Sequence, residues 1–88
     1  MPLRVVEFQP TPNPNAIKCL LDRAVADAPR SFRAPESAGD DAIASRLFAI
    51  HGVTNVLIVG DWLTVGKVPG VPWPAMKRSI VAALALVP

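Results

Sequence analysis

The chain has 88 residues, of which 51% are hydrophobic and 18% charged, with a formal net charge of +2. This length accommodates one domain with one core, and the composition excludes a disordered tail. The basic residues are scattered apart from Lys77-Arg78, which argues against a nucleic-acid partner.

Two strands joined by a proline-rich turn are predicted at the start of the chain. Leu3 to Phe8 contains residues that favour the extended state. Three prolines then prevent residues 9–15 from forming a central strand or a helix, because proline lacks an N–H. Ala16 to Leu21 resumes as a strand, and its alternation places Cys19 with the apolar residues of one face.

A helix follows an irregular segment. Residues 23–41 are rich in Pro, Gly and small side chains, with a short extended piece expected at Ser31 to Ala34. Asp40 or Asp41 is a suitable N-cap, and Gly52 suits the position just after the helix. The apolar stripe between these ends is formed by Ile43, Ala44, Leu47, Phe48 and Ile50.

A hairpin and a second helix are predicted in the last third of the chain. In Asn55 to Lys67, two β-rich runs flank Gly60-Asp61, which favours a two-residue hairpin turn of the primed type. Pro74 suits the first turn of a helix that extends to about Leu86.

The predicted order of elements is strand, strand, helix, strand, strand, helix. This order favours an α+β, two-layer fold in which an antiparallel four-stranded sheet carries two helices on one face. We expect residues 1–88 to form a single domain.

Several segments resemble one known family. The stretches PTPNPNAIKCLLD, SRLFAIHGV and NVLIVGDWLTVGK, followed by Trp73, Lys77 and Ile80, are similar in order and spacing to the N-terminal domain of the Nfu/NifU-like iron–sulfur scaffold proteins. The most specific stretch is Thr11 to Lys18. The resemblance implies the fold and an association with iron–sulfur cluster assembly. Full-length members hold the cluster with a C-x-x-C motif in a second domain, and these 88 residues contain no C-x-x-C motif.

Cys19 and His51 are the strongest candidates for metal or acid–base chemistry. A lone cysteine on the apolar face of a strand is typical of a small buried hydrophobe, and metal sites need about four ligands. We therefore expect no metal and no cofactor. A homodimer that carries a metal or cluster with Cys19 from two chains is one alternative. His51 suits the C-terminal end of the predicted helix, and a small-ligand domain around His51 is the other alternative.

The Thr11 to Asn15 turn is the more informative candidate. Its asparagines favour turns closed by side-chain hydrogen bonds, and its prolines favour a rigid recognition edge; the two interpretations are compatible. No catalytic constellation is found, so we expect a non-catalytic docking module whose partners are iron–sulfur assembly or client proteins. The predicted protein-binding residues are Thr11, Asn13, Asn15, Lys18, Arg33 and Asp61.

The remaining expectations concern compartment and assembly. We expect no secretory signal, and the longest apolar run, Ile80 to Val87, is far shorter than the roughly 20 residues of a membrane span. One cysteine favours a reducing cytoplasm. An open sheet edge beside the turn allows pairing with a second copy, so we expect a monomer or a weak dimer.

Overall fold

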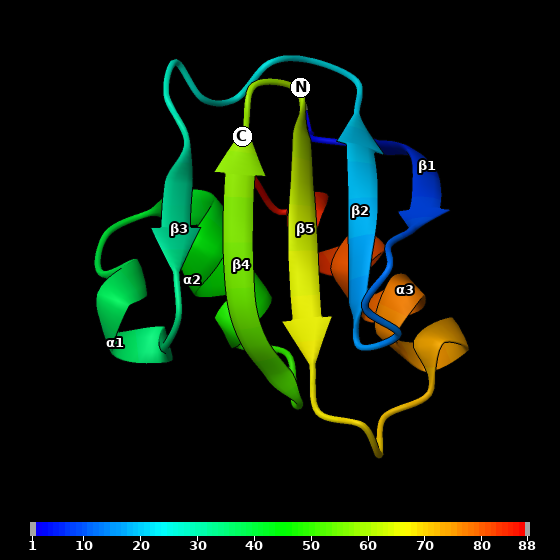
Figure 1. The fold of residues 1–88 in the computed structure, drawn as a ribbon. Coiled ribbons are helices and arrows are strands. Elements are labelled where there is room, and N and C mark those ends of the chain that lie inside the picture. Colours follow the sequence, from blue (N-terminus) through cyan, green and yellow to red (C-terminus); the bar gives the residue numbers. More distant parts are fainter. Residues whose placement is uncertain (1, 88) are drawn as a thin grey trace.

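A five-stranded antiparallel sheet forms one layer of the structure, with helices behind it (Figure 1). The structure is a computed structural model and describes residues 2–87. The strand order in the sheet is β1-β2-β5-β4-β3. The elements are β1 (Val5–Pro10), β2 (Ala16–Leu21), β3 (Arg30–Phe32), α1 (Pro35–Ala38), α2 (Ala42–Phe48), β4 (Val53–Val59), β5 (Trp62–Lys67) and α3 (Trp73–Leu84).

The centre of the sheet is the antiparallel pair of β2 and β5, which runs from Ala16 opposite Gly66 to Leu20 opposite Trp62. This pairing places the turn before β2 at the same end of the sheet as the end of β5. The Gly60-Asp61 tip lies at the other end of the sheet.

The core lies between the sheet and the helices. Along β2 every second residue is buried, and Cys19 is fully buried as the alternation predicts. The opposite face of the sheet carries no helix (Figure 1). The largest fully buried core side chains are Leu3, Leu47, Val56, Ile58, Leu63, Val65, Met76, Ile80 and Leu84.

The prediction of four strands was wrong, because residues 30–32, which overlap the extended piece expected at Ser31 to Ala34, form a fifth. In β3, Arg30 lies opposite Ile58 and Phe32 opposite Val56 at the edge of the sheet. Three residues are too few to show a period of two, so the pairing depends on the free edge of β4. The short helix α1 was also not predicted.

The first strand extends further than predicted. Gln9 and Pro10 belong to β1 and lie opposite Lys18 and Ile17. β1 is an edge strand, and an edge strand tolerates proline because the missing N–H can face away from the ladder.

The helix boundaries show one agreement and one correction. Pro74 lies in the first turn of α3, as predicted. α2, however, ends at Phe48, well before Gly52. Gly52 has a positive φ of 96° and serves the turn into β4 instead. Among the described residues, no helix is long and apolar enough to cross a membrane.

The predicted hairpin is confirmed. Val59 lies opposite Trp62 across Gly60-Asp61. The φ of Gly60 is +54°, and Asp61 is not among the residues of positive φ. A positive φ at the first central residue alone is the pattern of a type II′ turn.

The N-cap of α2 provides a test of the fold. Asp41 accepts hydrogen bonds from the N–H groups of Ile43 (3.0 Å) and Ala44 (2.8 Å) and pairs with Arg30 at 2.8 Å. We expect Asp41→Ala to lower the free energy of unfolding by about 1–2 kcal/mol in urea denaturation. Asp40→Ala, at the exposed neighbour, should change it by less than about 0.5 kcal/mol. Equal effects of the two substitutions would contradict the assignment of Asp41 as the cap.

Candidate functional site

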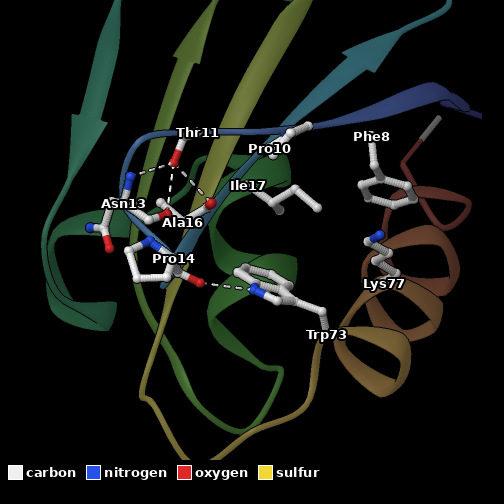
Figure 2. A pocket seen from close by; sticks show the side chains of 9 residues that line it. All are labelled: Phe8, Pro10, Thr11, Asn13, Pro14, Ala16, Ile17, Trp73 and Lys77. Atoms are coloured by element: carbon white, nitrogen blue, oxygen red, sulfur yellow. Dashed lines mark hydrogen bonds between the residues drawn. The ribbon is translucent and has the colours of Figure 1, made fainter.

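The turn before β2 is held by its own hydrogen bonds (Figure 2). The Thr11 hydroxyl oxygen accepts from the Asn13 N–H at 3.2 Å and lies within donating distance of the carbonyl oxygens of Asn13 (2.8 Å) and Ala16 (3.0 Å). The Asn13 side-chain oxygen accepts from the Asn15 N–H at 2.9 Å, and the Asn13 carbonyl accepts from the Ala16 N–H at 3.1 Å. The prediction of a turn closed by a side chain is therefore confirmed at Asn13.

Two further hydrogen bonds fasten this turn to distant parts of the chain. The Asn15 carbonyl accepts from the Lys67 N–H at 2.8 Å, at the end of β5. The Pro14 carbonyl accepts from the indole N–H of Trp73 at 3.0 Å, at the start of α3. Consecutive carbonyl groups of the turn are thus fixed by β5 and α3.

The ring of Trp73 is also contacted by a buried lysine. The Nζ atom of Lys67 lies 4.9 Å from the centroid of the Trp73 ring and donates to the Val68 carbonyl at 3.3 Å. Lys67 is only 7% exposed, so this cation–π contact is desolvated and stronger than one at the surface. The indole therefore has a fixed position beside the turn.

A cavity of about 420 Å³ opens between the turn, β1, β2 and the start of α3, lined by the residues labelled in Figure 2. Thr11 and Asn13 supply polar groups, whereas Phe8, Ile17 and Trp73 supply apolar surface. The Lys77 amine lies 5.5 Å from the centroid of the Phe8 ring. The site thus combines a rigid polar turn with an apolar wall and one cation.

Three of the six predicted binding residues come together here. Thr11 and Asn13 line the cavity, and Asn15 belongs to the same turn. Lys18 is on the helix-free face of the sheet, where its Nζ lies 4.5 Å from the centroid of the Trp62 ring. β2 therefore carries Lys18 away from the cavity.

The structure does not bring Arg33 and Asp61 to this turn. Asp61 is at the hairpin tip, at the opposite end of the β2–β5 ladder. Arg33 follows β3, which is the edge strand farthest from β1.

Phe8, Trp73 and Lys77 are the site residues that sequence reasoning missed. In the sequence, Trp73 and Lys77 appear only among the residues that resemble the family, and no motif marks them as binding residues. Trp73 and Pro14 are separated by 59 positions, so no local pattern joins them. The only sequence signal was the position of Trp73 directly before Pro74 at a predicted helix start.

Comparison with known proteins decides the family. The family model described as "Scaffold protein Nfu/NifU N terminal" matches residues 6–87. The chain belongs to this family. The resemblance carried by Thr11 to Lys18 is therefore confirmed.

Individual relatives agree with this assignment. The chain is 33% identical to NifU-like protein 5, mitochondrial, of Arabidopsis thaliana, over 90% of this chain and 29% of that protein. It is 32% identical to the human mitochondrial NFU1 iron-sulfur cluster scaffold homolog, over 90% of this chain and 32% of that protein. It thus spans about a third of the length of these relatives. Both are named as mitochondrial, and a cytoplasmic location of this chain stays a prediction.

A solved structure shows the same fold. The solution structure of a NifU-like protein from Saccharomyces cerevisiae has a TM-score of 0.75 and 24% sequence identity, and the match covers 90% of this chain and 73% of that chain.

Cys19 of this Nfu/NifU N-terminal domain lies inside the core. Its side chain is fully buried, and this desolvation raises the pKa of the Cys19 thiol from 9.0 to about 12, with Lys77 opposing the rise in part. A thiolate is the form that binds metal or attacks an electrophile. In residues 2–87, no three His, Cys, Asp or Glu side chains gather where they could hold a metal ion. Cys19 and its surroundings within one chain therefore do not fit an iron–sulfur cluster site.

His51 is exposed and does not line the cavity. It lies beyond the end of α2 at Phe48 and beyond the C-cap Ala49, so it is not at the C-terminal end of the helix, where the sequence predicts it.

The hydrogen bond between Trp73 and Pro14 can be tested by Trp73→Phe. We expect the free energy of unfolding to fall by about 1 kcal/mol and hydrogen exchange at the Asn15 and Ala16 amides to accelerate, because the turn loses one fastening. Trp62→Phe is the control, since no hydrogen bond of its indole is found among the described residues. Unchanged exchange at both amides in Trp73→Phe would show that Trp73 does not fix the turn.

Burial of Cys19 makes a pH-dependent contribution to stability. The folded state keeps the Cys19 thiol protonated to about pH 12. Between pH 9 and 12 this thiol therefore loses its proton only in the unfolded chain, and the free energy of unfolding falls as pH rises through this window. We expect this loss to reach up to about 1.4 kcal/mol per pH unit.

Urea denaturation of wild type and Cys19→Ala at pH 8, 9 and 10 measures the effect. The wild-type free energy of unfolding should fall more steeply above pH 9 than that of Cys19→Ala. Parallel slopes would contradict the raised pKa.

Proposed function

We propose that this domain is a non-catalytic docking module in iron–sulfur cluster assembly, which binds an assembly or client protein at the cavity beside the Thr11–Asn15 turn. The observation that carries the proposal is the fixed geometry of this cavity, whose turn and Trp73 indole are both held in place by hydrogen bonds. The family membership and the names of the relatives support the link to cluster assembly.

The turn is suited to recognition because its shape exists before a partner arrives. Its prolines and hydrogen bonds have already removed most of its conformational freedom, which lowers the entropic cost of binding. Within residues 2–87 the side-chain amide nitrogen (Nδ2) of Asn13 and the side chain of Asn15 carry no hydrogen bond. These groups are therefore available to a partner's backbone or polar side chains.

The apolar wall supplies the second component of a binding site. Phe8 and Trp73 are half-buried, so each presents part of its ring to a partner. Interfaces are enriched in aromatic residues at their desolvated centres and in polar groups at their rims. The cavity has this arrangement, with Asn13 at the exposed turn and the rings below it.

The proposal treats the iron–sulfur cluster as cargo of the partner proteins. A carrier dimer would have to bring two buried Cys19 side chains out of two cores. A ligand site or enzyme around His51 would need neighbouring groups, and His51 is exposed and outside the cavity. No observation favours either alternative.

The experiment is an affinity capture from a reduced, anaerobic lysate of the source organism, with metal analysis of the bait. Asn13→Asp keeps the oxygen that accepts from the Asn15 N–H but replaces the amide donors with a negative charge. Asn55→Asp is the matched control, because Asn55 is exposed on β4 and its side-chain oxygen accepts from the Thr54 hydroxyl at 2.9 Å.

We expect metal-free wild type and Asn55→Asp to recover iron–sulfur assembly or client proteins, and Asn13→Asp to lose them. Equal recovery by all three baits would remove the turn from the interface. Stoichiometric metal on the wild-type bait, or a wild-type capture without iron–sulfur proteins, would reject the proposed function.

A further inference from the structure

A second depression adjoins the cavity. It measures about 450 Å³ and is lined by Phe8, Lys77, Arg78, Val81, Ala82 and Ala85. Phe8 and Lys77 line both spaces. Together they form one elongated surface along β1 and α3, which we name the β1–α3 groove.

The floor of the β1–α3 groove is apolar and open. Val81 is 46% exposed, although large aliphatic side chains in helices normally face the core. Ala82 and Ala85 keep the floor low, so a polypeptide backbone can approach α3 closely. A partner that covers this floor would remove apolar surface from water.

The charged residues that line the β1–α3 groove have one sign. They are Lys77 and Arg78, and no Asp or Glu of the described residues lines the groove. Within residues 2–87, the ion pairs join Arg23 to Asp22 and Arg30 to Asp41. Lys77 and Arg78 therefore have no carboxylate partner in the part of the chain that the structure describes.

We propose that the β1–α3 groove binds an extended segment of a partner protein that combines acidic and apolar side chains. Carboxylates of this segment would meet Lys77 and Arg78, and apolar side chains would cover Phe8 and Val81. This inference rests on the proposed function and specifies the kind of segment that docks beside the turn.

The shape and charge of the groove favour this occupant over others. A second copy docked symmetrically through the same groove would place Lys77 and Arg78 of both chains together, where like charges repel. An anionic membrane would match the charge and the apolar floor. A membrane surface, however, would not fill the cavity beside the polar turn at one end of the groove. An extended segment can occupy the cavity and the floor together.

The experiment selects peptides from a random twelve-residue phage library on the metal-free 88-residue chain. We expect enriched peptides to contain both acidic and apolar residues, and their synthetic forms to bind in fluorescence anisotropy. The double variant Lys77→Glu, Arg78→Glu should weaken binding at least about tenfold, since each contact changes from attraction to repulsion.

Three control measurements keep the test specific. Arg33→Glu, Arg46→Glu makes the same change in net charge on other elements and should bind the peptides as wild type does. Val81→Ser removes apolar floor at an exposed position without changing charge and should weaken binding several-fold. Circular dichroism and urea denaturation establish that each variant is folded.

Several outcomes would overturn the inference. The inference is wrong if no peptides are enriched, if the enriched peptides lack acidic residues, or if the Lys77→Glu, Arg78→Glu variant binds them as wild type does. It is also wrong if an NMR titration with an enriched peptide shifts resonances on the helix-free sheet face instead of in the groove. Binding only to phosphatidylglycerol vesicles, or self-association abolished by the double variant, would assign the groove to those occupants.

The two proposals can fail separately. Capture of iron–sulfur proteins by wild type together with failed peptide selection would reject only the groove inference. Acidic peptides at the groove, with no iron–sulfur protein captured from the lysate, would reject only the proposed function.

Discussion

β2 and β5 pair at the centre of the sheet, and this ladder joins the two halves of the chain. β2 follows the N-terminal turn and β5 closes the C-terminal hairpin, so their contacts link residues about 40 to 50 positions apart, from Leu20–Trp62 to Ala16–Gly66. Because the pair is antiparallel, the end of β5 arrives beside the start of β2. There the Lys67 N–H donates to the Asn15 carbonyl. Residues 68–72 connect β5 to α3 and place Trp73 beside Pro14. The candidate site is a consequence of this one register.

The end of β5 is closely packed against the neighbouring strand β4. A Cβ atom at Gly66 would collide with the side-chain amide of Asn55 on the neighbouring strand, so this position accepts no side chain without movement of Asn55. The next residue, Lys67, buries its stem and places its amine against the Trp73 ring, as long cationic side chains do when their apolar part is covered. Lys67 thus holds the turn through its N–H and the indole through its amine without lining the cavity.

The parts of the fold that local chemistry determines could be predicted from the sequence. Alternation placed Cys19 in the core, Gly60-Asp61 marked the hairpin, and Pro74 marked the start of α3. The parts that depend on a distant partner could not be predicted. An extended piece was expected at Ser31 to Ala34, but β3 is too short to show a period, and its place in the sheet depends on the edge that β4 offers. Likewise, the asparagine at position 13 predicted a turn closed by its side chain. Nothing near Pro14 in the sequence indicated that Trp73 would lie against this turn.

Burial of the cysteine and the charge of the groove are physically connected through Lys77. Desolvation outweighs the influence of Lys77 on Cys19, so the pKa of the thiol is raised rather than lowered. At pH 7 a thiol with the ordinary pKa of 9.0 is also neutral, so burial changes the charge of Cys19 only above about pH 9. Burial thus prevents Cys19 from becoming a thiolate counter-charge for Lys77 even at alkaline pH. The charge of Lys77 is left to the cavity and the groove, where an acidic partner can meet it.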